Sequence, residues 1–142
     1  MSEPRTNQEV FDYVLEKLYE QGRPSVNPRS PKECLYRGDA GARCAAGWLL
    51  PDDLWKQRYN AYGFAALPAE IMDDPRMCHL DVDLVVAMQD AHDDAAVACA
   101  KDARQGDWLR DWLRKMQGVA RNFNLQYRDP TPSTPAGGSE EP

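Results

Sequence analysis

The amino-acid sequence predicts a mainly α-helical single domain with a loop-rich or small β-hairpin insertion near residues 34–45. Three segments carry apolar side chains at the spacing of a helix face, at 7–21, at 81–104 and after Gly106. The chain has 142 residues and 42% hydrophobic content, which suffices for one domain with its own core. A mixed α+β class is the alternative, because short apolar runs do not distinguish a hairpin from an irregular loop.

The first helix is predicted at residues 7–21. Thr6 provides an N-cap hydroxyl, and Glu9, three positions later, completes a capping-box pattern. Gly22 supplies the stop, because glycine adopts the left-handed conformation of a helix C-terminus without steric cost. The apolar residues of this segment share one face and are expected to pack in the core: Val10, Phe11, Val14, Leu15 and Leu18.

Residues 23–33 contain three prolines and no helical period, which predicts a surface connection. Residues 34–37 then suit an extended segment, residues 38–41 favour a turn, and residues 42–45 would return as a partner strand. An irregular loop folded against the first helix is the alternative to this hairpin. Short helices are predicted after Pro51 and at residues 68–72, each following a proline.

Two longer helices complete the predicted domain, which spans residues 7–128. Asp81 is a candidate N-cap for a helix running to about Arg104, and a last helix follows Gly106. Residues 1–6 are expected to be flexible. Residues 129–142 hold four prolines, two glycines and no base, and are expected to be disordered because they bury too little apolar surface to offset ordering.

The stretch from Cys34 to Asp53 is the least generic part of the chain. It contains Cys34, Tyr36 and Arg37, then a glycine-containing turn, then CAAG at 44–47, and it ends in LPDD at 50–53. This pattern resembles a family of small uncharacterised proteins of bacteriophage, prophage and bacterial genomes. The resemblance takes in the helix before this stretch and MQDAHD at 88–93, and so covers most of residues 7–125. It implies a phage-associated protein and carries over no catalytic role.

The composition favours a soluble cytosolic protein, in the bacterial host cytosol if phage-encoded. No apolar run approaches a membrane span, and the first ten residues lack the basic-then-apolar order of a signal peptide. The four cysteines are therefore expected to stay reduced. The absence of a glycine-rich phosphate loop, a nucleophile elbow and a His-Glu-x-x-His motif argues against ATPases, nicotinamide dehydrogenases, serine hydrolases and zincins.

One hypothesis for a site is a thiol enzyme with Cys44 as nucleophile, His92 as base and Asp93 or Asp90 as the orienting carboxylate. A helix beginning at Cys44 would lower the pKa of its thiol by favouring the anion. The ordinary alternative for His92 is a hydrogen-bonded core histidine, since it falls on the apolar stripe of its helix.

Metal binding is a second hypothesis. Cysteine and histidine are zinc ligands, and Cys34, Cys44, Cys78 and His79 are the candidate set, with His92 and Cys99 as further candidates. None of the cysteines forms a Cys-x-x-Cys pair, so structural zinc is not favoured and no cofactor is predicted. Buried reduced cysteines that pack as small apolar residues are the stronger interpretation.

The net charge of −6 is unevenly distributed along the chain. Residues 70–94 carry eight acids and one base, whereas residues 104–128 carry six bases and two acids. Two helices facing each other with complementary charge would explain this pattern, and so would separate surfaces for partners. Direct nucleic-acid binding is disfavoured because the whole protein is acidic.

The favoured function is therefore an accessory protein, monomeric or a small homo-oligomer, that binds another protein. Its acidic surface would imitate the phosphate backbone and inhibit a host or defence enzyme. The thiol enzyme is the alternative. The candidate binding residues combine the acidic side chains with the aromatic-basic pair of the central stretch: Tyr36, Arg37, Asp52, Asp53, Asp73, Asp74, Asp90 and Asp94.

Overall fold

A computed structural model of the chain describes residues 6–27, 29–101 and 108–130. Its helices are α1 (Asn7–Gln21), α2 (Ala45–Leu49), α3 (Ala69–Met72), α4 (Val82–Lys101) and α5 (Trp108–Asn122). Two strands, β1 (Val26–Asn27) and β2 (Ser30–Cys34), form a small antiparallel sheet. The predicted mainly α class is confirmed.

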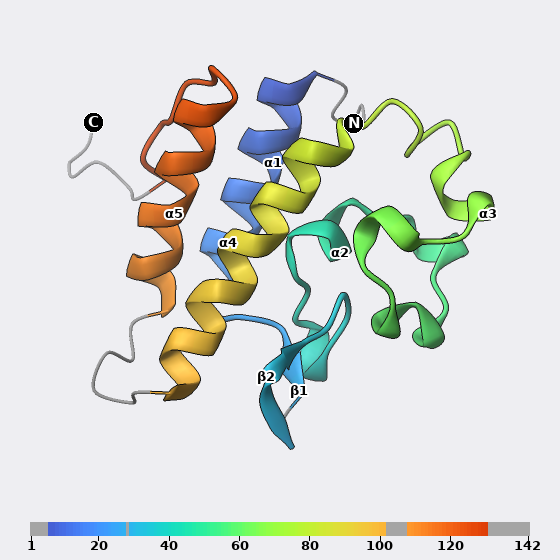
Figure 1. Cartoon of the computed structure of the whole chain (residues 1–142), viewed down its shortest axis with the longest axis horizontal. Coiled ribbons are helices and arrows are strands. Elements are labelled where there is room, and N and C mark those ends of the chain that lie inside the picture. The colour runs from blue at the N-terminus through green and yellow to red at the C-terminus, as the bar shows by residue number, and fades with distance from the viewer. Residues whose placement is uncertain (1–5, 28, 102–107, 131–142) are drawn as a thin grey trace, which may run out of the picture.

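The three long helices form one side of the molecule. Figure 1 shows α4 beside α5, with α2, α3 and the two strands on the other side of α4, and α1 contacts α5 and α2. Four turns of 3-10 helix lie between α2 and α3 or just before α2: η1 (Asp39–Gly41), η2 (Asp52–Leu54), η3 (Gln57–Ala61) and η4 (Phe64–Ala66). Because α4 contacts α5, β2 and α2, it is the element on which both sides of the domain pack.

Helix α1 begins and ends as predicted. The Thr6 hydroxyl accepts a hydrogen bond from the Glu9 amide, and the Glu9 carboxylate accepts one from the Thr6 amide. Gly22 ends the helix in the left-handed conformation, with φ of 73°. The five apolar residues of the predicted face are all buried, so this face packs in the core.

The predicted cap of α4 is also confirmed. Asp81 Oδ1 accepts hydrogen bonds from the amides of Asp83 and Leu84, and Asp81 Oδ2 accepts one from the Asn7 side chain, which ties the start of α4 to α1. The predicted continuation to Arg104 lies outside the described residues. Helix α5 then presents Trp108 and Trp112 to the core as a stacked pair, with ring centroids 5.2 Å apart.

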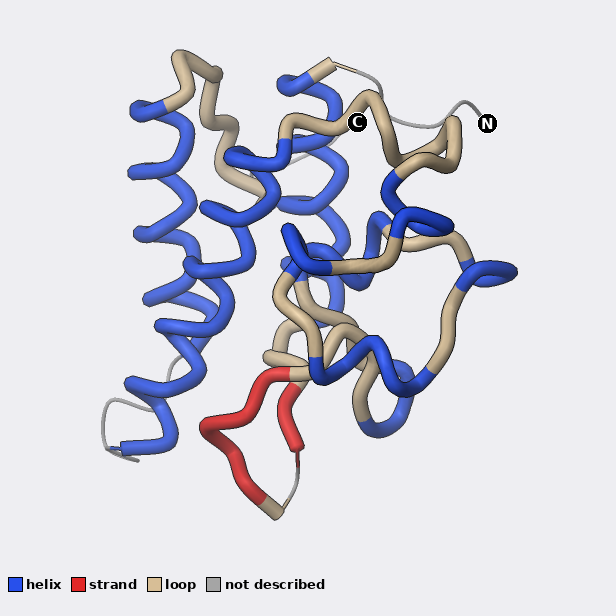
Figure 2. Tube along the Cα trace, turned by 45° about the vertical axis from the view of Figure 1, so that its right-hand side comes forward, coloured by secondary structure: helices blue, strands red, loops and turns tan. Residues whose placement is uncertain are grey.

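The sheet lies earlier in the chain than the predicted hairpin. Strands β1 and β2 occupy part of residues 23–33, where the prolines favoured a strandless connection, and Val26 pairs with Cys34 (Figure 2). That expectation was wrong because both strands of a two-stranded sheet are edge strands. Proline has no backbone N–H, but at the open side of an edge strand that donor is not needed for pairing, so Pro31 is compatible with β2. At the predicted position, a single bridge joins Arg37 to Arg43 across the η1 turn.

Residues after α5 are fixed to the beginning of α1. The Gln8 side chain donates to the Gln126 carbonyl at 3.0 Å and accepts from the Gln126 amide at 2.9 Å. Residues 131–142 of the predicted tail lie outside the described residues. No helix among the described residues is long and apolar enough to cross a bilayer.

Candidate functional site

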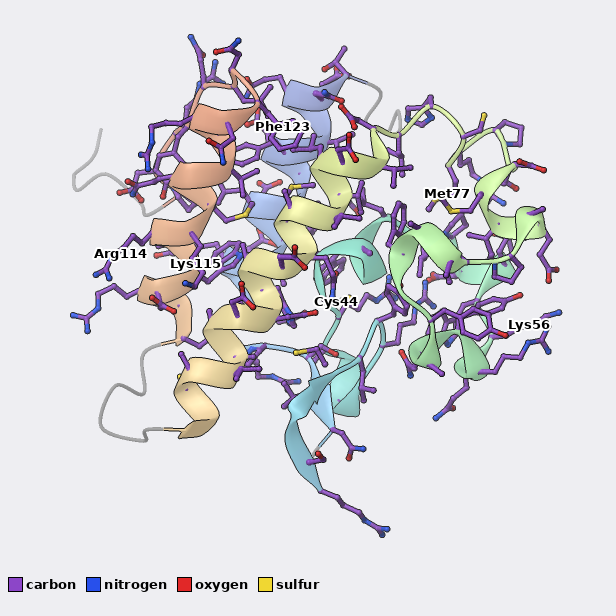
Figure 3. The ribbon with its side chains drawn as sticks, in the orientation of Figure 1. Cys44, Lys56, Met77, Arg114, Lys115 and Phe123 are labelled. Carbon is purple, nitrogen blue, oxygen red and sulfur yellow. The ribbon has the colours of Figure 1, made fainter. Side chains whose placement is uncertain are left out.

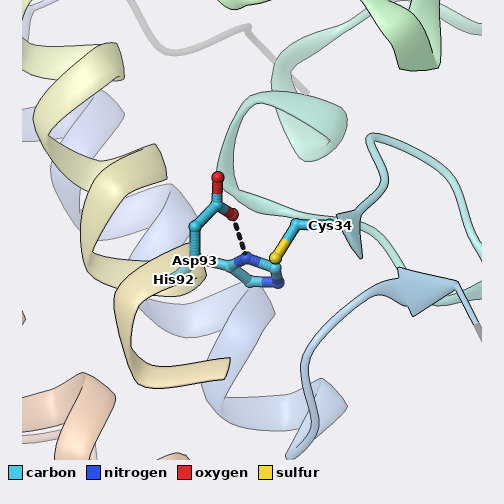
Figure 4. Close-up of side chains that lie close together, drawn as sticks. All are labelled: Cys34, His92 and Asp93. Carbon is cyan, nitrogen blue, oxygen red and sulfur yellow. Dashed lines mark hydrogen bonds and ion pairs between the residues drawn. The ribbon is translucent and has the colours of Figure 1, made fainter. Parts of the chain in front are cut away.

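The most concentrated group of chemically capable side chains lies where β2 meets α4. Cys34 belongs to β2, and His92 and Asp93 are consecutive residues of α4. One sulfur, nitrogen or oxygen atom from each lies within 4.8 Å of the other two (Figure 4). His92 is completely buried, whereas the Asp93 side chain keeps 34% of its surface exposed. The histidine of this cluster is therefore buried, and the cluster reaches solvent through the Asp93 side chain.

Both ring nitrogens of His92 are used within the fold. Nε2 accepts the amide N–H of Ser25 at 3.0 Å, and Ser25 is itself fully buried. Because Nε2 is the acceptor, the ring proton resides on Nδ1, which donates to Asp93 Oδ1 at 2.8 Å. The structure thus fixes one tautomer of His92 and leaves it no nitrogen lone pair for a substrate.

Asp93 extends this network to α2. Besides His92, its Oδ1 accepts from the Gln89 side chain at 3.0 Å, and Gln89 Oε1 accepts from the Ala46 amide at 3.0 Å. Burial and the adjacent Asp93 carboxylate raise the pKa of Cys34 above that of an ordinary thiol. Cys34 is therefore a neutral thiol at pH 7, and the cluster joins the strands, α4 and α2 by hydrogen bonds.

The predicted pairing of Cys44 with His92 is not what the fold provides. Cys44 does cap the start of α2, where its sulfur accepts the Gly47 amide at 3.4 Å. Its side chain is completely buried, however, and lies in the interior near α4 (Figure 3). Burial raises the pKa of Cys44 to about 12 despite the hydrogen bond from Gly47. The cost of desolvating the Cys44 thiolate therefore exceeds its stabilisation by the start of α2. The cysteine that lies beside His92 is Cys34.

Sequence reasoning missed Ser25 and Gln89 as members of this cluster, and it considered Cys34 as a metal ligand but not as the thiol beside His92. Ser25 contributes a backbone N–H, which no residue-type pattern identifies. The position of Cys34 depends on the register of β1 and β2, which was not expected in that segment.

Among the described residues, the ligand atoms that converge are those of Cys34, His92 and Asp93, and not the predicted set with Cys78 and His79. These three residue types suit zinc. A metal on His92 would need a ring lone pair, and hence the loss of the bond to Ser25 or to Asp93. The existing hydrogen bonds therefore compete with a metal at this position.

Thiol labelling should follow burial. Cys78 is exposed, Cys34 and Cys99 are partly buried, and Cys44 is fully buried. We expect iodoacetamide at pH 7 to label Cys78 first and Cys44 last, roughly a hundredfold or more slower, because Cys44 reacts only when the structure opens. Peptide mass spectrometry over time measures the order. Fast labelling of Cys44 in the folded protein would restore the thiol-enzyme hypothesis.

Several predicted binding residues are occupied within the molecule. Asp52 pairs with Arg37 at 2.7 Å and with Arg43 at 3.3 Å. Arg37 also donates to the Leu50 carbonyl at 2.9 Å, and its guanidinium lies 5.1 Å from the centroid of the Trp55 ring. These contacts hold the Cys34–Asp53 stretch together.

Tyr36 is likewise a structural residue, because it is buried and its hydroxyl donates to the Tyr62 carbonyl at 2.6 Å. Asp53 and Asp74 share Arg76, which donates to Asp53 at 2.8 and 3.0 Å and to Asp74 at 2.9 and 3.0 Å. No sequence pattern predicts the link to Asp53, since Arg76 is 23 residues away from it.

Arg76 should govern part of the acid stability. Its hydrogen bonds lower the pKa of Asp74 to about 2. A carboxyl whose pKa is lower in the folded state stabilises the fold above its unfolded pKa of about 3.9, and this contribution is lost as the pH falls toward 2. Arg76→Gln should therefore lose less stability than wild type between pH 4 and pH 2, as measured by urea unfolding. Arg114→Gln, a change on the exposed side of α5, should retain the wild-type pH dependence.

The remaining candidates, Asp73, Asp90 and Asp94, are exposed. No ion pair engages any of them within the part of the chain that the structure describes. Burial, followed by the charges of Asp94 and Asp93, raises the pKa of Asp90. The carboxylates of this part of α4 therefore repel one another in the free protein.

The chain matches no protein-family model, and no curated protein and no solved structure is similar to it, so the family resemblance stays a prediction.

Proposed function

We propose that this is a phage- or prophage-associated accessory protein that binds another protein through an acidic surface on α4. This surface, the α4 acidic surface, consists of Asp90 and Asp94 with the exposed part of Asp93. The observation that carries the proposal is that Asp90 and Asp94 have no ion-pair partner among the described residues, whereas Asp52, Asp53 and Asp74 are paired internally. The partner would present a basic surface, as enzymes that act on nucleic acids do for the phosphate backbone.

The position of the basic residues supports this proposal. Helices α4 and α5 pack together through buried apolar side chains, including Met88 and Met116. Lys115 pairs with Asp111 of its own helix, and Arg114 projects from α5 into solvent (Figure 3). Within the described ranges, Arg114, Lys115 and Arg121 form no ion pair with the α4 acidic surface. The α4 acidic surface is therefore not neutralised by these three residues of α5.

The electrostatics of α4 supply a driving force for such a complex. Like charges one turn apart destabilise a helix by a few tenths of a kcal/mol, and a basic partner would convert this repulsion into attraction. Association governed by surface charge is steered at long range and weakens with salt. Inhibition follows where the covered basic surface is the substrate-binding surface of an enzyme.

The alternative of a thiol enzyme has less support. The pKa of Cys44 is raised to about 12, that of Cys34 is also raised, and His92 uses both ring nitrogens for Ser25 and Asp93. A nucleophilic thiolate needs a lowered pKa and a free base.

The test is affinity capture from bacterial lysate with quantitative mass spectrometry, using wild type, Asp94→Lys and the double variant Asp90→Lys/Asp94→Lys. A true partner should be captured by wild type, lost by the double variant, and released as NaCl rises from about 0.05 to 0.5 M, because the Debye length falls below 10 Å. With the purified partner, Asp94→Lys should weaken binding about tenfold.

The control matched to Asp94→Lys is Glu16→Lys, which makes the same change of charge at an exposed site on α1. It should capture the same partner as wild type. If the double variant captures the same proteins as wild type, or if the partner withstands high salt, the α4 acidic surface is not the binding surface.

A further inference from the structure

A pocket with a different chemical character lies on α1, apart from the α4 acidic surface. It has a volume of about 330 Å³ and is open to solvent between the C-terminal half of α1, residues 40–42 and Trp48. This volume falls at the small end of the range for small-molecule sites. Its charged lining consists of Lys17, Arg23 and Glu20, so cations outnumber carboxylates in a protein whose net charge is −6.

The wall of this pocket is fixed by Gln21. The Gln21 side-chain oxygen accepts the Trp48 indole N–H at 3.2 Å and the Arg43 amide at 2.9 Å. Its nitrogen donates to the carbonyls of Arg43 at 3.0 Å and Arg23 at 2.6 Å. With its donors and acceptor engaged, Gln21 holds the indole and the flanking backbone in one arrangement, as a preformed site requires.

Of the two cations that line the pocket, Lys17 lies against the indole, and Arg43, which lies outside the lining, contacts the same ring. Lys17 Nζ lies 5.8 Å from the centroid of the Trp48 ring and 5.7 Å from that of Tyr13. The Arg43 guanidinium lies 5.0 Å from the Trp48 centroid. Lys17 forms no ion pair with any described carboxylate, and its ammonium group instead lies over two aromatic rings. A bound anion would supply the counter-charge that these rings do not.

The opposite wall of the pocket contains strained backbone. Ala40 has φ of 52° and Gly41 has φ of 79°, so two consecutive residues adopt the left-handed conformation. Alanine does so at a cost, and such residues concentrate at ligand-binding and active sites. The Arg23 guanidinium donates to the Ala40 carbonyl at 3.1 Å, which ties this turn to the cationic side of the pocket.

We propose that this pocket binds a small ligand through a phosphate or carboxylate group placed between Lys17 and Arg23. Glu20 and the C-terminal end of α1, with its partial negative charge, act against the anion. Lys17 has no ion-pair partner among the described residues and is able to donate a charge-assisted hydrogen bond to the ligand, and Arg23 adds a second positive charge to the same lining. The ligand body would lie along residues 40–42 and the edge of Trp48.

Two-dimensional ¹H–¹⁵N NMR tests this proposal through the indole N–H signal of Trp48, which is assigned with Trp48→Phe. Inorganic phosphate and succinate are titrated separately at constant ionic strength. We expect a saturable shift of the Trp48 signal with at least one of the two anions. Saturation with phosphate alone assigns the site to phosphate compounds, and saturation with succinate alone assigns it to carboxylates.

Charge variants then locate the binding site. Lys17→Gln and Arg23→Gln should each weaken binding about tenfold, because each removes one of the two positive charges of the lining. Glu20→Gln should tighten binding about twofold, a gain that a damaged fold would not produce. Arg114→Gln on α5 is the matched control and should leave the affinity unchanged. An absence of saturation with both anions overturns the proposal, as does equal affinity in wild type, Lys17→Gln and Arg23→Gln.

Discussion

Replacing Gly47 with alanine should strongly destabilise this domain. A Cβ atom at Gly47 would overlap the carbonyl oxygen of Tyr36 and lie 2.9 Å from its carbonyl carbon. That carbonyl also accepts the Cys44 amide at 3.3 Å, so neither segment is able to move without breaking the contact between them. We expect a loss of about 3–5 kcal/mol in the free energy of unfolding, measured by urea titration with circular dichroism.

Gly118 provides the matched control in helix α5. A Cβ atom there would meet only the end of the Arg121 side chain, at 3.8 Å. Gly118→Ala should therefore stabilise the protein by up to about 1 kcal/mol, because alanine is the better helix former. If Gly47→Ala unfolds at the same urea concentration as wild type, the close approach of α2 to Tyr36 is wrong.

Replacing His92 with leucine should have the next largest effect. The substitution leaves the buried Ser25 amide without its acceptor at Nε2 and removes the donor to Asp93. The unsatisfied Ser25 amide costs about 1–3 kcal/mol, whereas Asp93 keeps its bond from Gln89, so the expected loss is about 2–3 kcal/mol. Hydrogen exchange should report the same site, because the Ser25 amide would lose its protection even where the rest of the fold persists.

The second histidine serves as the control. His79 is only partly buried, and His79→Leu should change the stability by no more than about 0.5 kcal/mol. If His92→Leu is as stable as His79→Leu, or if the Ser25 amide stays protected in it, His92 does not hold the strands against α4.

The long helices were predictable because their information is local. Thr6, Glu9 and Gly22 mark the ends of α1, and Asp81 marks the start of α4, each through contacts within a few residues. The strands were misplaced because the prolines and the lack of a helical period in residues 23–33 indicated a loop, whereas both strands of a two-stranded sheet are edges and tolerate proline.

The candidate site was less predictable because it depends on long-range contacts. Cys44 matched the pattern of a nucleophile at a helix start, but the pattern contains no information about burial, which decides its pKa. Similarly, Asp53 and Asp90 look alike in sequence, yet one pairs with Arg76 and the other faces solvent. Which acids remain available to a partner is thus a property of the tertiary structure.

The pairing of Gln8 with Gln126 has a consequence for synthesis. These contacts join residues 118 positions apart, and α5 also packs on α1. During translation, the apolar face of α1 leaves the ribosome long before α5 exists to complete its covering. At about 5–20 residues per second, that interval lasts several seconds. The core of the nascent chain is therefore incomplete until nearly the whole domain has emerged. Chaperones would act on the chain during this period.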